Sequence, residues 1–512
     1  MKNLSFIMLL GFWVMSCSTS KYTSAETSVQ VSFVQINDVY EIDALEGGTS
    51  GGMARAATLK NQVLAENPNT LLIMAGDFLS PSVYNSLKVD GTPVRGKQMV
   101  EAMNAAGMDI AVFGNHEFDI RESELKDRIN ESTFEWISGN TFNNISNVVT
   151  PFSKVINGKA YPFPKYLIRT FKNDQGHSIK LGFISVCLPF NKSSYVVYTD
   201  PLSTAEMLYH QIKDSCDAVV AITHQAMEDD IELAKRLPEL ALIMGGHEHD
   251  MRLQRVGKVW ITKAHANSKS AFINRLRIVR KQTQTKEVEV TPELKYLDTS
   301  VVKHTSTQEV VQKWSAKAAK NFASLGFDAQ RVILEKGEEL EGRESYVRST
   351  TTNLTKLVIR SMEYAAPQAD VAIVNSGSIR VDDVLKMPLT EYDIIRTLPY
   401  GGAITEVEMK GSLLRQVLDI GVQNRGIGGF LQYSESLKNL DGQWTISEVL
   451  IQDTSSYRVA LTEFLLTGGE ANLGFLKPNH PGITEVYPLS NSQFDPRSDI
   501  RLAIIRYISK EK

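Results

Sequence analysis

The sequence predicts an α/β fold divided into two domains with a connecting helix. Its 512 residues exceed the length that one hydrophobic core usually supports. Between about residues 31 and 280, short apolar runs alternate with stretches of helical periodicity, which is typical of strand–helix–strand units around a buried sheet. After residue 331 the chain begins a second unit with strands of its own. These observations favour two α/β domains in series.

The expected elements can be placed in chain order. We predict the first domain at residues 28–290, a linking helix within 300–330 and the second domain at 331–512. The linking helix is indicated by the amphipathic, Ala- and Lys-rich stretch Thr305–Leu325. The clearest elements of the second domain are two strands and a closing helix, at Val371–Val374, Ile404–Met409 and Ile500–Ile508.

Residues 1–17 resemble a bacterial lipoprotein signal peptide. Lys2 supplies a positive start, and the apolar run Phe6–Met15 is too short to span a bilayer as a stable helix. We expect cleavage before Cys17 and a lipid on its thiol; an ordinary secretory signal that is cut further on is the alternative. Both interpretations predict an exported protein, in the periplasm or at the cell surface. The only membrane contact expected is a lipid anchor at Cys17.

Charge and cysteine content exclude some classes of function. The formal net charge is −4, so the chain lacks the basic field that holds nucleic acid polymers non-specifically. An anionic substrate must therefore be held by local arginines or by metal ions. The chain has three cysteines, too few for a thiolate-rich zinc site.

Five predicted strands end in residues that bind metals. In an open α/β sheet, ligand sites form just outside the carboxyl ends of the strands. Taken singly, a Gly-Asp pair after a strand is usually a turn and a lone His is usually structural. Five such ends in one region favour a metal site. The strands and the residues that follow them are Val31–Ile36 with Asn37-Asp38, Leu71–Ala75 with Gly76-Asp77, Ile110–Phe113 with Gly114-Asn115-His116, Ala218–Ile222 with Thr223-His224, and Leu240–Met244 with Gly245-Gly246-His247-Glu248-His249.

This set of donors suits phosphate ester hydrolysis. Two divalent ions close together neutralise the phosphate oxygens, lower the pKa of a water and orient an in-line attack. Asp77 is the candidate for a carboxylate that bridges the two ions. Oxygen and imidazole donors without sulfur fit zinc, manganese, iron, cobalt or magnesium, and the pattern does not choose among these metals.

These motifs resemble the signature of calcineurin-like metallophosphoesterases. Their order and spacing are similar to the bacterial and animal 5'-nucleotidases, including the UDP-sugar hydrolases. The resemblance covers nearly the whole mature chain and implies a four-layer αββα sandwich followed by an α/β substrate-binding domain. It implies that one metal is held by Asp38, Asp77 and His249, and the other by Asp77, Asn115, His224 and His247. It also implies that His116 is catalytic, with Asp119 orienting its ring, and that Glu117 is structural.

One residue departs from the family pattern. The family usually has Asp-x-His at the first strand, whereas this chain has Tyr40 in the third position. A phenol must lose a proton with a pKa of about 10 before it becomes a strong ligand. Three outcomes remain open: the first metal binds more weakly, Tyr40 binds it as a phenolate, or a water takes the position.

The resemblance extends to a substrate pocket in the second domain. It implies phosphate contacts from arginines, a base stacked between two aromatic rings, and a carboxylate on the ribose. Glu470 stands where the family usually has Asp, which places the sugar contact in doubt. The alternatives are that the arginines are solvated surface charges and that the rings are core residues. The implied substrate residues are Arg343, Arg348, Asn375, Arg380, Tyr400, Phe464 and Glu470.

We therefore predict a 5'-nucleotidase in which a metal-activated water attacks phosphorus directly. Within the same family, a UDP-sugar diphosphatase, a 2',3'-cyclic nucleotide phosphodiesterase and an enzyme acting on a sulfur-based ester are the alternatives, because Tyr400 and Glu470 alter the nucleoside pocket. An alternative of another class is a surface lipoprotein whose metal centre has lost activity; Tyr40 alone favours it.

Overall fold

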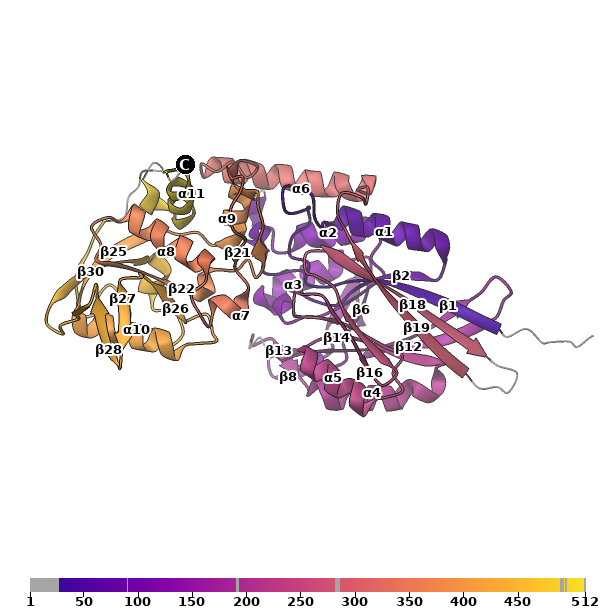
Figure 1. Cartoon of the computed structure of the whole chain (residues 1–512). Helices are drawn as coiled ribbons and strands as arrows, with labels where there is room; N and C mark the ends of the chain where they lie inside the picture. Colours follow the sequence, from indigo (N-terminus) through magenta and orange to yellow (C-terminus); the bar gives the residue numbers. More distant parts are fainter. Residues whose placement is uncertain are drawn as a thin grey trace, which may run out of the picture.

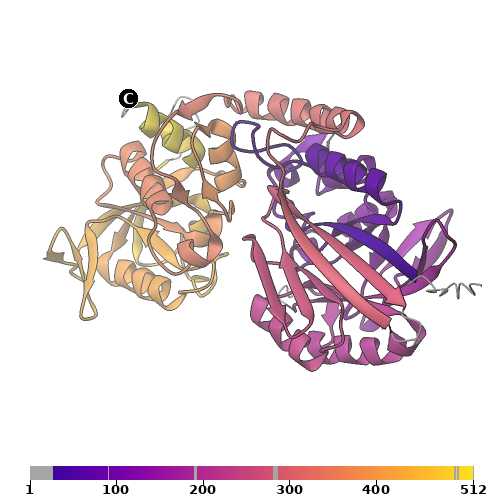
Figure 2. The same cartoon turned by 45° about the vertical axis from the view of Figure 1, so that its right-hand side comes forward.

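The computed structural model describes residues 27–89, 91–189, 193–280, 286–488, 492 and 495–510. Figure 1 shows two domains side by side, with helix α6 (Thr305–Ser324) extending along the first domain toward the second. Figure 2 shows the same arrangement from a second direction. The predicted signal segment and Cys17 lie outside the described residues. Within those residues, no helix combines the length and the apolar character needed to cross a bilayer.

The first sheet of the first domain has six strands. Its central strands β1, β2, β5 and β6 are parallel, and β18 and β19 add an antiparallel edge. In spatial order the strands are β19 (Lys286–Tyr296), β18 (Ser270–Arg280), β1 (Thr27–Ile36), β2 (Thr70–Met74), β5 (Ile110–Val112) and β6 (Glu135–Ile137).

A second six-stranded sheet packs against the first. Its strands β12, β14, β15 and β17 are parallel, and its two edge strands are antiparallel. In spatial order they are β11 (Tyr166–Lys172), β12 (Ser178–Cys187), β14 (Ala218–His224), β15 (Leu242–Gly246), β17 (Val259–Lys263) and β16 (Arg252–Val256).

Alternating side chains along each strand build the layers. Phe33 on β1 points between the sheets and meets Phe183 on β12, with ring centroids 5.9 Å apart. The next residue, Val34, faces the opposite way and packs with the outer helices. Helices α1 (Met53–Glu66), α2 (Lys97–Ala105) and α3 (Glu122–Glu131) cover the first sheet, and α4 (Pro201–Ile212) and α5 (Met227–Arg236) cover the second. The resulting helix–sheet–sheet–helix arrangement confirms the predicted four layers.

The second domain is built on one five-stranded mixed sheet. Helices α8 (Asn353–Ala365) and α11 (Ile500–Lys510) cover one face, and α10 (Gly411–Gln423) covers the other. The strand order is β26 (Leu431–Tyr433), β22 (Val371–Asn375), β30 (Ser456–Thr462), β25 (Ile404–Lys410) and β31 (Ile483–Val486). This observation confirms a second α/β unit with its own sheet.

Helix α6 is docked on the first domain and reaches the second. Its buried face includes Trp314, whose indole Nε1 donates a hydrogen bond to Glu101 on α2 at 2.9 Å. At its other end, the ring of Phe322 lies 6.3 Å from that of Tyr392 in the second domain. The helix therefore spans the junction of the two domains.

Candidate metal centre

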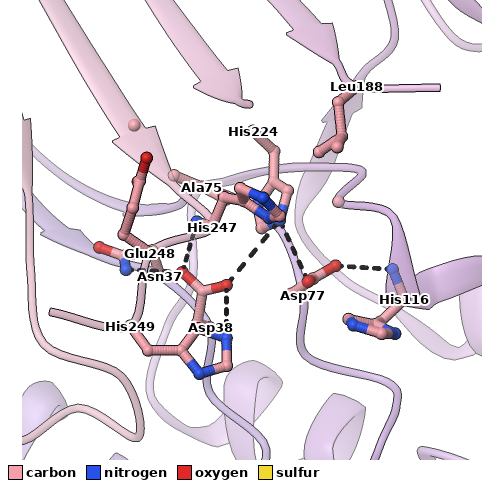
Figure 3. Close-up of polar contacts among 12 residues, drawn as sticks. Asn37, Asp38, Ala75, Asp77, His116, Leu188, His224, His247, Glu248 and His249 are labelled. Carbon is pink, nitrogen blue, oxygen red and sulfur yellow. Dashed lines mark hydrogen bonds and ion pairs between the residues drawn. The ribbon is translucent and has the colours of Figure 1, made fainter. Parts of the chain in front are cut away.

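Five of the six residues predicted to bind metals have side chains that lie together where the two sheets meet (Figure 3). Asp38, Asp77 and Asn115 follow strands β1, β2 and β5 of the first sheet. His224 ends β14 of the second sheet, and His247 and His249 follow β15. Figure 3 shows five of these side chains, all except Asn115, converging from both sheets. The carboxyl ends of two sheets, rather than of one, therefore supply the cluster.

The centre of the cluster is a buried triad of two carboxylates and one imidazole. His224 Nε2 lies 3.1 Å from Asp77 Oδ2 and 3.8 Å from Asp38 Oδ1. One ligand atom from each of these three residues lies within 4.8 Å of the other two. All three side chains are almost fully buried. Two carboxylates that lie this close together and are shielded from water need a neighbouring positive charge to offset the cost of burying them.

The backbone at this edge is held in an unusual conformation. Asp38, Asp77 and His249 have positive φ angles of 52°, 57° and 56°, and His247 has one of 94°. Non-glycine residues in this region are strained, and such strain persists where the surrounding structure enforces it. Gly114 allows the close packing, because a Cβ there would lie 2.1 Å from Asp77 Oδ1.

Lone pairs in the cluster face one another when His224 is neutral. His224 Nδ1 donates to the carbonyl of Ala75 at 2.8 Å, so a neutral ring presents the lone pair of Nε2 to the carboxylates. Among the described residues, the buried Nε2 of His224 and Oδ1 of Asn115 have no hydrogen-bond partner. Bound cations would satisfy these donors, so the residues fit the expected metals.

Protons can take the place of cations when no metal is bound. Burial opposes protonation of His224, but Asp77 and Asp38 outweigh it and raise its pKa to about 9. Burial and the charge of His224 lower the pKa of His247 to about 4. Metal ions and protons therefore compete for His224, whereas His247 presents a free lone pair at neutral pH.

Glu117 holds the loop that carries Asp77. Its buried carboxylate accepts hydrogen bonds from the backbone N–H groups of Asp77 at 3.0 Å, Phe78 at 2.7 Å, Leu79 at 3.1 Å and Gly114 at 2.6 Å. It thereby joins the turns after β2 and β5. This geometry supports the structural role that was expected for Glu117.

His116 and Asp119 form the predicted dyad beside the cluster. His116 Nδ1 lies 2.7 Å from Asp119 Oδ2, and the His116 backbone N–H donates to Asp77 Oδ1 at 2.8 Å. Burial lowers the pKa of His116, but Asp77 and Asp119 reverse this and raise it. A protonated imidazole next to the centre can steady a phosphate oxygen or a leaving group.

A cavity of about 470 Å³ lies in the second domain. Its lining includes Tyr400 and Phe464, whose side chains are 68% and 46% exposed, so neither ring is a core residue. The Nε atoms of Arg348 and Arg380 are buried and have no hydrogen-bond partner among the described residues. Six predicted substrate residues line this cavity: Arg348, Asn375, Arg380, Tyr400, Phe464 and Glu470.

The seventh predicted residue, Arg343, is not among those lining the cavity. Its guanidinium pairs with Glu341 Oε2 at 2.5 Å and approaches Asp250 Oδ2 of the first domain at 3.4 Å. Its guanidinium also lies over the ring of Tyr346. Arg343 is therefore placed at the contact between the domains, where its charge is already balanced.

Asp382 is a site residue that the sequence analysis did not identify. Its Oδ2 lies 3.0 Å and its backbone carbonyl 3.1 Å from Nδ1 of His249. The second domain thus orients a predicted ligand of the first. Its position two residues after Arg380, a predicted substrate residue, was the available signal, but a single acidic residue in a loop does not by itself indicate a function.

Comparison with known proteins identifies both domains. Residues 31–251 match the calcineurin-like phosphoesterase family, and residues 332–476 match the 5'-nucleotidase C-terminal domain. The trifunctional nucleotide phosphoesterase protein YfkN of Bacillus subtilis is 24% identical in an alignment of 485 positions, which covers 83% of this chain but 31% of that protein. Protein UshA of Yersinia enterocolitica is 24% identical in an alignment of 549 positions, which covers 93% of this chain and 94% of UshA.

The fold is also found in a solved structure. The crystal structure of a 5'-nucleotidase precursor from Thermus thermophilus superposes with a TM-score of 0.66 at 21% identity. The similarity covers 94% of this chain and 97% of that protein. Both domains and their order along the chain are therefore shared.

Proposed function

Because this chain belongs to the family of metal-dependent phosphoester hydrolases that join a calcineurin-like phosphoesterase domain to a 5'-nucleotidase C-terminal domain, we propose that it hydrolyses phosphate monoesters of nucleotides. The phosphate binds at the metal centre of the first domain. The nucleoside binds in the cavity of the second domain.

The position of Arg380 carries this proposal. Arg380 lines the 470 Å³ cavity with the two exposed rings, and it also lines a small cavity beside Tyr40 and Asn267 in the first domain. Its NH2 group lies 3.9 Å from Asp119 Oδ2 of the dyad. One guanidinium thus lies between the nucleoside cavity and the metal centre, where a planar fork suits phosphate oxygens.

Different side chains serve different steps of the proposed reaction. We assign Asp38, Asp77 and His249 to one cation, and the same Asp77 with Asn115, His224 and His247 to the other. The two cations, when bound, neutralise the phosphate oxygens and activate a water for in-line attack. His116 holds a proton near the leaving group, and Asp119 fixes the orientation of its ring.

The cavity suits a nucleoside. A base can stack between Tyr400 and Phe464, which is worth about 1–3 kcal/mol and tolerates different bases. Asn375 Nδ2 donates to Glu470 Oε2 at 2.6 Å, so the carboxylate is oriented despite its longer side chain. Glu470 can then accept hydrogen bonds from the sugar hydroxyls.

Phosphate release from a substrate panel tests the proposal. The metal-loaded protein is assayed with nucleoside monophosphates, a UDP-sugar, a 2',3'-cyclic nucleotide and a small alkyl phosphate that has no aromatic ring. Phe464→Ala should raise KM for the nucleotide about 10-fold, consistent with the loss of stacking on one ring, and leave the alkyl phosphate unaffected. Equal losses on both substrates, or no phosphate release from nucleotides, would contradict the proposal.

The same panel separates the alternatives. Turnover of the UDP-sugar with inert monophosphates identifies a diphosphatase, and turnover of the cyclic nucleotide identifies a phosphodiesterase. A protein that binds no metal and hydrolyses none of these esters corresponds to the inactive surface lipoprotein. The intact buried cluster around Asp77 opposes that last outcome.

We also propose export with a lipid on Cys17. This rests on the signal-like residues 1–17 of the sequence. Cell fractionation with Cys17→Ser tests it: the variant should leave the membrane fraction, whereas an unlipidated secretory protein would fractionate identically with and without the change.

A further inference from the structure

The hydroxyl of Tyr40 lies among three predicted ligands of the first cation. Tyr40 is 6% exposed, and its Oη is 2.9 Å from His249 Nε2 and 3.2 Å from Asp77 Oδ2. Asp38 Oδ1 lies 3.5 Å from the same hydroxyl and 3.4 Å from His249 Nε2. Four donor atoms from four residues therefore face one small volume.

These separations match the edges of a coordination shell. Two ligand atoms about 2.1 Å from one ion are about 3.0 Å apart at a right angle and about 3.4 Å apart at the tetrahedral angle. The separations given above, from 2.9 Å to 3.5 Å, fall within or next to this range. These separations are compatible with a cation bound by Tyr40 together with its neighbours.

The same atoms present lone pairs to a cation when His249 is neutral. His249 Nδ1 faces only acceptors, the carbonyl and the carboxylate of Asp382, so it carries a proton. In the neutral ring, Nε2 then presents a lone pair, as do the oxygens of Asp38 and Asp77. Tyr40 has one hydroxyl proton for these three acceptors. A second proton on His249 can supply the rest in the metal-free protein, and a bound cation would take the place of these protons.

We propose that the Tyr40 oxygen is a direct ligand of the first cation, in the position where the family pattern leads us to expect a histidine. This inference rests on the proposed metal centre. On binding, the O–H bond of Tyr40 breaks, the proton passes to solvent, and the oxygen donates an electron pair to the cation. The first site then has three anionic oxygens and one imidazole.

The two sites consequently differ in chemical character. The second site has one shared carboxylate, the amide oxygen of Asn115 and the imidazoles of His224 and His247. Hard anionic oxygens favour iron or manganese, whereas imidazole-rich sets suit zinc. The Tyr40 site should therefore select the harder ion, and the protein should hold two different metals when both kinds are supplied.

Iron reports directly on a tyrosine ligand. Metal-free protein is loaded with iron in air, and bound metal is counted by elemental analysis while the visible spectrum is recorded. Iron(III) bound to a phenolate oxygen gives a charge-transfer band that carboxylate and imidazole ligands do not produce. We expect this band in the wild type and in Tyr84→Phe, a buried tyrosine control whose hydroxyl faces Ser315.

Two variants at position 40 complete the test. Tyr40→Phe should lose the band and weaken the first site at least 10-fold while the second site keeps its metal. Tyr40→His should also lose the band but retain two metals, because imidazole restores a ligand. A wild type with two bound irons and no band, or a band that survives in Tyr40→Phe, overturns the proposal alone. A wild type that binds no metal overturns the metal centre as well.

Discussion

Replacing Asp382 by Asn should weaken the first metal site from a distance. The substitution keeps size and shape, and Asn tolerates the positive φ of 39° at this position. Its Oδ1 can still accept the hydrogen bond from the backbone N–H of Glu344. The amide group, however, would face the Nδ1–H of His249, so a donor would meet a donor where a carboxylate now accepts at 3.0 Å.

The structure sets the size of the effect. Loss of a partner that orients a metal-binding His usually reduces metal affinity about 10–100-fold. The backbone carbonyl of Asp382 stays 3.1 Å from Nδ1 and continues to orient the ring, so we expect roughly a 10-fold loss. Burial would raise the pKa of Asp382, but His249 and the Glu344 N–H lower it from 3.8 to about 2. The direction of this shift shows that the ionised carboxylate of Asp382 is the form that interacts favourably with His249.

Calorimetric titration of metal-free protein with manganese measures this loss. Asp383→Asn is the matched control, since Asp383 pairs with Lys269 at 2.7 Å and Arg396 at 3.4 Å and does not contact a ligand. Asp382→Asn should weaken one of two sites, and Asp383→Asn should leave both unchanged. Unchanged affinity in Asp382→Asn, or equal losses in both variants, would refute the reasoning.

Three further outcomes follow from the centre. The pKa of His224 is raised from 6.5 to about 9 in the folded metal-free protein, so its protonation stabilises the fold fully below pH 6.5 and no longer does so once the pH has risen through 9. The melting temperature of metal-free protein should therefore fall between these pH values. The melting temperature of metal-loaded protein should fall much less. Gly114→Ala places a Cβ 2.1 Å from Asp77 Oδ1 and should abolish metal binding, whereas Gly474→Ala, with its nearest atom at 3.9 Å, should not. Arg380→Lys keeps the positive charge but loses the two parallel N–H donors of the guanidinium group. The KM for nucleotides, measured by steady-state kinetics, should rise about 10-fold.

The metal centre could be predicted because its signals are local. Each ligand lies at or shortly after the end of a short apolar run, and in three of the five motifs a glycine stands between the run and the ligand. The assignment of strands to sheets had no such signal. Strands β5 and β14 look alike as apolar runs, yet they lie in different sheets, because pairing depends on contacts between segments far apart in the chain.

The less predictable residues are those whose role depends on the other domain. Arg343 belongs to a family-like segment, but Glu341 and Asp250 already balance its charge. Asp382 acquires its contact with His249 only through the way the domains meet. Tyr40 was recognised as a departure, and the choice among its three outcomes required the position of its hydroxyl.

The presence of ligands on both six-stranded sheets has a consequence for the contact between them. An ion bound by both Asp77, which follows a strand of the first sheet, and His224, which ends a strand of the second, would link the two sheets at this edge. In the metal-free protein, the buried carboxylates at this edge are compensated by protons, such as the one on His224. Loading with metal should therefore strengthen the contact between the two sheets at this edge, in addition to the apolar core that they already share.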